Sequence, residues 1–182
     1  MRARQAAAWA GALLALASCA QLETATRADQ VFELSGRIAA RQGAESFSGN
    51  VAWRHAGGGD ELLITSPLGQ GVARIVRDRD GVVLTTAEPR EYRAADAESL
   101  TEQALGFRLP LAGLADWVRA RPTAGSRFSI EKDAAGRVKL LEQSGWKIEY
   151  LEYEERLPEP LPSRLRLTYP GIDLRLAISE WK

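Results

Sequence analysis

The chain has 182 residues, with 24 Lys and Arg against 24 Asp and Glu, one His and one Cys. Balanced charge argues against a nucleic-acid-binding protein, and a single Cys excludes an internal disulfide and a Cys-rich zinc site. With 45% hydrophobic residues, 16 Gly and 5 Trp, the composition favours one small β-rich domain.

The first 18 residues have the pattern of a signal peptide. Arg2 and Arg4 precede an uncharged apolar run at residues 6–17, which is too short to span a bilayer. The run ends in Leu16-Ala17-Ser18-Cys19, and small residues before a lone Cys resemble the lipobox of bacterial lipoproteins. The resemblance implies cleavage of residues 1–18 and acylation of Cys19.

The residues after Cys19 indicate a tethered domain. Ala20 stands where Asp would favour retention in the inner membrane, so the lipobox resemblance implies the periplasmic face of the outer membrane. Residues 19–30 have little periodicity and are interpreted as an acylated tether, followed by a folded domain at residues 31–182. The alternative is an ordinary secreted protein in which Cys19 is incidental.

From Val31 onward, apolar residues alternate with polar ones at the period of a β-strand. We predict strands at residues 31–41, 47–54, 62–64, 72–77, 82–86, around 92, 128–131, 138–142, 146–150, 164–169 and 172–179. Residues 56–60 are predicted to form a loop, as is the proline-rich segment 157–162. Tyr153 is out of phase with Tyr150, which predicts a β-bulge.

Two helices are predicted in the middle of the chain. Asp96 can cap the first, which has Ala97, Leu100 and Ala104 as its apolar stripe and Gly106 at its end. Pro110 can open the second. We therefore predict a mainly β (α+β) fold: a single curved antiparallel sheet of about eleven strands, forming a half-open barrel, with two or three helices covering its concave face.

The sequence lacks the common motifs of catalysis. It has no Gly-rich phosphate loop, HExxH, GxSxG or CxxC motif, so we predict no catalytic residue, no metal site and no cofactor. His55 precedes a Gly-rich segment and is interpreted as a solvated loop residue. Glu154 and Glu155 are interpreted as part of a solvated face.

Four arginines occupy alternate positions in predicted strands: Arg37, Arg164, Arg166 and Arg175. Alternation places them on the outward face of the sheet. We expect them to stay separate and not to form a basic stripe, which again argues against nucleic acid as a partner.

Four stretches follow the lipobox in a characteristic order. They are Phe32-x-Leu34-x-Gly36-Arg37-Ile38 with Phe47-Ser48-Gly49 and Trp53; Ser66-Pro67-Leu68-Gly69-Gln70; Ala95-Asp96-Ala97-Glu98 with Leu105-Gly106, Leu109-Pro110-Leu111 and Leu114-x-x-Trp117; and Gly145-Trp146-x-Ile148-x-Tyr150 with Leu161-Pro162 and Trp181. Together they resemble the LolB family of outer-membrane lipoprotein receptors, over nearly the whole mature chain.

The resemblance implies a function. LolB-like proteins accept acylated lipoproteins from the soluble periplasmic carrier LolA and release them into outer-membrane lipid. Only the receptor is itself acylated, and Cys19 therefore places this chain on the receptor side. A monomer is expected.

The resemblance and the alternation together suggest two functional regions. An apolar cavity for acyl chains, incompletely filled by side chains, is expected from the inward positions Phe32, Leu34, Ile38, Phe47, Val51, Trp53, Ile64, Trp117, Trp146, Ile148 and Tyr150. A simple packed core is the alternative for each of them. Pro67, Leu68 and Gly69 form a predicted turn. The family resemblance implies that Leu68 projects from this turn and inserts cargo into the bilayer.

Two other functions remain open at this point. One is an outer-membrane lipoprotein that acts as a lipid-binding or envelope-assembly scaffold without contacting the carrier. The other is a membrane-tethered enzyme, which clustered carboxylates with strongly perturbed pKa values in the cavity would indicate.

Overall fold

The computed structural model describes residues 31–88, 90–105, 111–155 and 158–182. Within them, the strands are β1 (Phe32–Gln42), β2 (Glu45–Ala56), β3 (Gly59–Thr65), β4 (Gly71–Arg77), β5 (Val82–Thr86), β6 (Glu91–Ala94), β7 (Phe128–Lys132), β8 (Val138–Gln143), β9 (Trp146–Glu154), β10 (Leu161–Tyr169) and β11 (Ile172–Trp181). The helices are α1 (Ala97–Leu105) and α2 (Leu111–Trp117).

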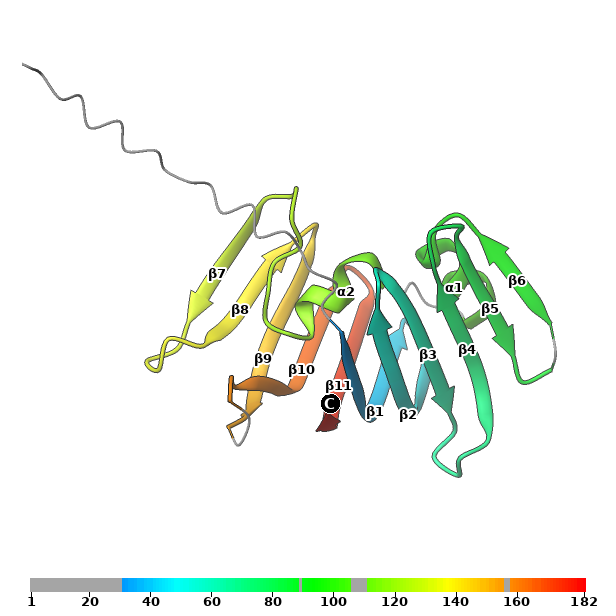
Figure 1. Cartoon of the computed structure of the whole chain (residues 1–182), viewed down its shortest axis with the longest axis horizontal. Helices are drawn as coiled ribbons and strands as arrows, with labels where there is room; N and C mark the ends of the chain where they lie inside the picture. Colours follow the sequence, from blue (N-terminus) through cyan, green and yellow to red (C-terminus); the bar gives the residue numbers. More distant parts are fainter. Residues whose placement is uncertain (1–30, 89, 106–110, 156–157) are drawn as a thin grey trace, which may run out of the picture.

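All of these strands belong to one antiparallel sheet. Their order is β6-β5-β4-β3-β2-β1-β11-β10-β9-β8-β7, so the first and last of the described strands pair at the centre. β6 and β7 are left as separate edges, and the sheet is open. Figure 1 shows it curving so that β7–β9 and β4–β6 stand on either side of α2. The predicted curved sheet of eleven strands is confirmed.

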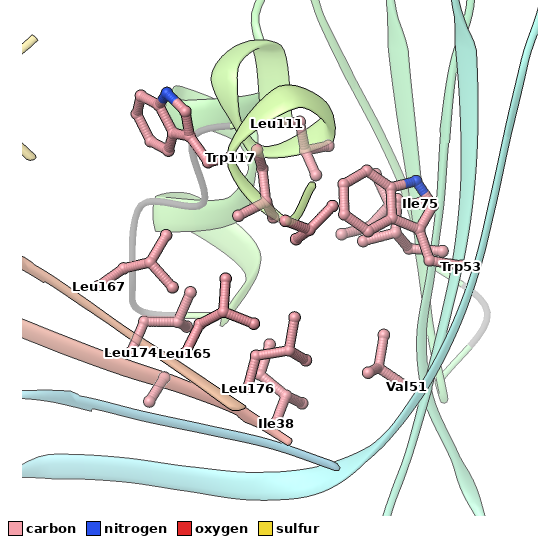
Figure 2. Packing of buried hydrophobic residues seen from close by; sticks show 14 of the residues in the cluster. Ile38, Val51, Trp53, Ile75, Leu111, Trp117, Leu165, Leu167, Leu174 and Leu176 are labelled. Atoms are coloured by element: carbon pink, nitrogen blue, oxygen red, sulfur yellow. The ribbon is translucent and has the colours of Figure 1, made fainter. Parts of the chain in front are cut away.

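The two faces of the sheet follow from the period-two pattern. In β1, Leu34 and Ile38 are buried whereas Glu33 and Arg37 are exposed. We call the face that carries Leu34 and Ile38 the inner face and the opposite one the outer face. Figure 2 shows inner-face side chains such as Ile38, Val51 and Leu176 converging beneath a helix that carries Leu111. The core therefore lies between the inner face and the two helices.

The described parts of the helices match their predicted positions. The Asp96 carboxylate accepts a hydrogen bond of 2.8 Å from the backbone N–H of Ser99, which confirms Asp96 as the cap of α1. α1 packs on β5 and β6 through buried residues such as Leu100. The predicted helix boundaries at Gly106 and Pro110 lie outside the described residues.

Two predicted loops are shorter in the structure. The loop expected at residues 56–60 is a two-residue turn, because Gly57 and Gly58 adopt φ values of 59° and 73° that suit a tight hairpin. β10 begins at Leu161, so the predicted loop at 157–162 was too long. Pro162 pairs with Tyr153 beside a register shift, where the ladder tolerates a residue without an N–H.

The predicted bulge in β9 is confirmed. Tyr150 pairs with Leu165 and Glu152 with Arg164, so Leu151 is the extra residue. The bulge returns Tyr153 to the side of Tyr150, with ring centroids 6.3 Å apart.

Candidate functional site

The fold gathers the predicted cavity residues into one apolar cluster on the inner face. Ten of the eleven are 8% exposed or less, and Phe47 is partly buried against them. They come from β1, β2, β3, β9 and α2, which are far apart in the sequence. These residues form one continuous cluster of aliphatic and aromatic side chains. Such side chains make non-directional contacts, which are also the contacts that acyl chains make.

This cluster is closed to water in the structure. Leu111 and Val118, both 0% exposed, belong to the same cluster on the side of α2. A hollow of about 710 Å³ does occur among the described residues, but it lies on the outer face. That the inner set leaves room for acyl chains therefore stays a prediction.

A buried glutamine fastens α2 to the sheet. The indole N–H of Trp117 donates to Oε1 of Gln143 over 2.8 Å, and Nε2 of Gln143 donates to the carbonyl of Thr123 and to Oγ of Ser126, both over 2.7 Å. Gln143 is 2% exposed. Sequence reasoning missed it, because a single Gln at the end of a predicted strand gives no signal of burial.

Tyr150 makes a second attachment to α2. Its hydroxyl donates to the backbone carbonyl of Trp117 over 2.8 Å. Burial, with a smaller contribution from Tyr153, raises the pKa of Tyr150, so the hydroxyl stays a neutral donor. The C-terminal end of α2 is therefore held to β8 and β9, and α1 lies against β5 and β6.

His55 is not the solvated loop residue that was predicted. It lies in β2 with its side chain 14% exposed, stacks on Phe32 at 5.1 Å and contacts Asp60 at 2.6 Å. Asp60 also accepts hydrogen bonds from Trp53 at 2.9 Å and from Arg77 at 2.6 Å. The reason is that the tight turn at 57–58 extends β2 and β3, which pairs His55 with Asp60.

The loop at residues 66–70 presents a leucine to solvent. Gly69 N–H donates to the Ser66 carbonyl over 2.8 Å, with Pro67 at the second position of this turn and φ of 84° at Gly69. The Ser66 carbonyl also accepts from Asn50 over 3.2 Å. Leu68, 90% exposed, projects as predicted. The turn was predictable from the sequence of residues 66–69, and the structure adds that the Leu68 side chain points into solvent.

The four arginines were wrongly predicted to remain separate. Arg37, Arg164, Arg166 and Arg175 all line the 710 Å³ hollow on the outer face. They are far apart in the sequence, and the pairing of β1 with β11 and of β11 with β10 brings them together.

The remaining expectations concern chemistry and the membrane. Cys19, the signal peptide at 1–18 and the tether at 19–30 lie outside the described residues. Across the described part of the chain, no three His, Cys, Asp or Glu side chains are placed to share a metal ion. Neither described helix has the length and apolarity needed to cross a bilayer.

Comparison of the sequence with known proteins matches one family throughout. A family model described as outer membrane lipoprotein LolB matches residues 30–181. The outer-membrane lipoprotein LolB of Thiobacillus denitrificans is 42% identical over 149 residues, covering 82% of this chain and 78% of the relative. That of Nitrosomonas europaea is 40% identical over 162 residues, covering 88% of this chain and 76% of the relative.

Solved structures with the same fold are more distant in sequence. A LolA superfamily protein from Nitrosomonas europaea has a TM-score of 0.52 at 11% identity, covering 85% of this chain and 86% of that one. A putative outer membrane lipoprotein-sorting protein domain from Vibrio parahaemolyticus has a TM-score of 0.51 at 13% identity, with 84% of both chains covered. The fold is shared with these proteins, and the match to the family model, together with relatives of up to 42% identity, shows that this chain belongs to the LolB family of outer-membrane lipoproteins.

Proposed function

We propose that this chain is an outer-membrane lipoprotein receptor, which accepts acylated lipoproteins from the periplasmic carrier LolA and incorporates them into the outer membrane. Membership of the LolB family carries the general function. The mechanism rests on one observation: the same domain has a large apolar cluster on the inner face of its sheet and an exposed leucine, Leu68, in the 66–70 loop. The receptor acts as a monomer and performs no catalysis.

The chemistry of the cargo explains why such a receptor needs an apolar inner face. Exposing about three long acyl chains to water costs on the order of 30 kcal/mol, at about 0.8 kcal/mol per CH₂. The periplasm offers no ATP, so each transfer must run downhill while most of the apolar area stays covered. The receptor must bind acyl chains slightly better than the carrier does and less well than the bilayer.

Cargo enters by replacing contacts between the helices and the sheet. The cluster is closed to water, so acyl chains must displace helix side chains such as Leu111 from the inner face. Apolar contacts exchanged in this way are non-directional and nearly equal in free energy. The hydrogen bonds from Trp117 and Tyr150 keep α2 on the β8 and β9 side during the exchange.

The anchor keeps the receptor at the target membrane. Acylated Cys19 holds the domain there, and two or more acyl chains give stable anchoring. The tether raises the effective concentration of the domain at the lipid surface. Mass spectrometry of the mature N-terminus tests this step, and an unmodified Cys19 would contradict it.

Leu68 carries the final step, in which cargo passes into the bilayer. Full burial of one leucine contributes only about 1.5–3 kcal/mol, which is too little to anchor the domain but enough to perturb lipid packing locally. We therefore expect Leu68→Glu to fold and to accept cargo from the carrier, but to lose most of its incorporation activity. The measurement is the fraction of labelled lipoprotein that reaches vesicles.

Phe128→Glu is the matched control. Phe128 lies in β7, at the edge of the sheet farthest from β4 to β6, and is 53% exposed. We expect it to incorporate cargo at the wild-type rate. Normal incorporation by Leu68→Glu would remove the proposed role of the loop.

A further inference from the structure

The outer face carries a groove that the proposed function does not use. It has a volume of about 710 Å³ and crosses β2, β1, β11 and β10. Arg37, Arg164, Arg166 and Arg175 line it, and no acidic residue is among the described residues of its lining. Leu151 of β9 lines the groove on one side and Pro67 of the 66–70 loop on the other.

Strand register explains why the face is hollow here. Arg37 pairs with Ala177, and Ala177 pairs in turn with Arg164. One row along, Ala39 pairs with Arg175 and Arg175 with Arg166. Neighbouring strands are about 4.8 Å apart, so each alanine lies directly beside arginines. Because the alanine side chains are short and the arginine side chains are long, the surface is depressed at Ala39 and Ala177. The floor is apolar and the walls are cationic.

The nearby carboxylates neutralise only part of this charge. Asp173 accepts from Arg166 at 2.6 Å and from Arg175 at 3.1 Å, and Glu152 accepts from Arg164 at 2.9 Å. Glu149 pairs in register with Arg166 and attracts it as well, but it also contacts Lys147 at 3.4 Å. Three carboxylates therefore lie beside four guanidinium groups. Among the described residues, the guanidinium group of Arg37 has no ion-pair or hydrogen-bond partner.

We propose that this groove binds the phosphate of an anionic membrane phospholipid. Guanidinium groups carry the opposite charge to phosphate, and the planar guanidinium fork can donate two N–H hydrogen bonds to a pair of phosphate oxygens. The apolar floor and the exposed Leu151, at 57%, suit the glycerol and upper acyl region of a lipid better than a free anion or an acidic protein surface.

The position of the groove beside the 66–70 loop also supports a membrane phospholipid as its ligand. Pro67 in its wall is next to Leu68, which the proposed function places at the bilayer, so the inference rests on that placement. A lipid headgroup in the groove would hold the outer face toward the membrane while Leu68 enters it.

The test measures binding of the full chain, carrying Cys19→Ala so that no acyl anchor holds it to lipid, to vesicles of phosphatidylcholine alone or mixed with phosphatidylglycerol. We expect wild-type protein to prefer the anionic vesicles, and high salt to reduce the preference. Arg37→Gln with Arg164→Gln should lower the preference on the order of tenfold, because each arginine near an anionic surface contributes to binding. Arg79→Gln with Arg127→Gln, at two exposed sites outside the groove, should leave it unchanged.

Two further variants keep the test independent of folding defects. Arg37→Gln alone breaks no ion pair within the described part of the chain and should cause a smaller loss. Ala177→Leu fills the groove without changing its charge and should also weaken anionic binding, which a purely electrostatic surface would not show. Binding of inorganic phosphate by the wild-type protein, with no preference for phosphatidylglycerol vesicles, would indicate a free-anion site and overturn the lipid assignment.

Transfer of cargo from the carrier in solution, without vesicles, separates this inference from the proposed function. We expect the double arginine variant to accept cargo normally. If it also keeps the wild-type preference for phosphatidylglycerol, the groove proposal is wrong and the receptor function stands. If it loses solution transfer but keeps lipid binding, the groove is a docking surface for the carrier and the lipid assignment is overturned.

Discussion

The two faces of the sheet are built from the same strands but are stabilised by different interactions. On β10 and β11, inner-face Leu165 and Leu176 are 0% and 5% exposed, whereas the side chains of outer-face Arg164 and Arg175 are 55% and 66% exposed. Apolar burial contributes about 25 cal/mol per Å², and exposed ion pairs contribute about 0–1 kcal/mol each. The inner face therefore determines the stability of the fold, and the outer face can be adapted for binding at little cost.

Buried polar groups sharpen this difference. Gln143 and Asp60 are 2% and 3% exposed and both are hydrogen-bonded to indole N–H groups, of Trp117 and Trp53. Such bonds fix the geometry of the inner face, because a buried donor or acceptor without a partner is costly. The outer-face pairs around Asp173 impose no such requirement.

The largest expected effect comes from a pair of leucines on adjacent strands. Leu165→Ala removes a 0% exposed side chain and should lower the free energy of unfolding by about 2–5 kcal/mol. Leu151→Ala, at a 57% exposed site, should cost less than about 1 kcal/mol. Urea denaturation measures both. Equal losses would show that the faces do not differ in the way described.

Two neighbouring residues of β8 give a smaller contrast. Gln143→Ala leaves the Trp117 indole N–H and the Thr123 backbone N–H without an acceptor and should cost about 2 kcal/mol. Glu142→Ala removes an exposed outer-face partner of Ser129 at 3.2 Å and should cost about 0.5 kcal/mol or less. Thermal unfolding followed by tryptophan fluorescence distinguishes the two variants. A silent Gln143→Ala would mean that α2 is not fastened through this residue.

The smallest effect is a pH dependence of the outer face. The hydrogen bond from Arg166, ahead of that from Arg175, holds the pKa of Asp173 below its ordinary value. Its contribution to stability is therefore present above the ordinary Asp pKa and is lost as the pH falls through the lowered value. Asp173→Asn should flatten the acid limb of a stability profile by less than about 1 kcal/mol. An unchanged acid limb would exclude Asp173 as a source of that dependence.

Much of the fold was predictable because it depends on local patterns. Alternation in β1 and β2, the Asp96 cap and the Ser66-Pro67-Leu68-Gly69 turn are each encoded within a few residues. The β9 bulge was also predictable, because Tyr153 breaks the two-residue alternation that Ile148 and Tyr150 follow. These features need no knowledge of which strands pair.

Features that depend on distant pairing were not predictable. The arginine groove requires β1 beside β11, and nothing in the sequence near Arg37 indicates that Arg164 lies two strands away. The burial of Gln143 depends in the same way on where α2 packs. Pro162 was assigned to a loop because proline rarely enters a paired strand, and the neighbouring register shift makes it tolerable here.

Transfer of cargo tests the central claim most directly. LolA loaded with a labelled acylated lipoprotein is mixed with this protein, and the two are then separated and assayed for label. We predict that the lipoprotein moves from the carrier to this chain, and from this chain to added vesicles. Retention of the lipoprotein on the carrier, with this chain folded and in excess, would contradict the account.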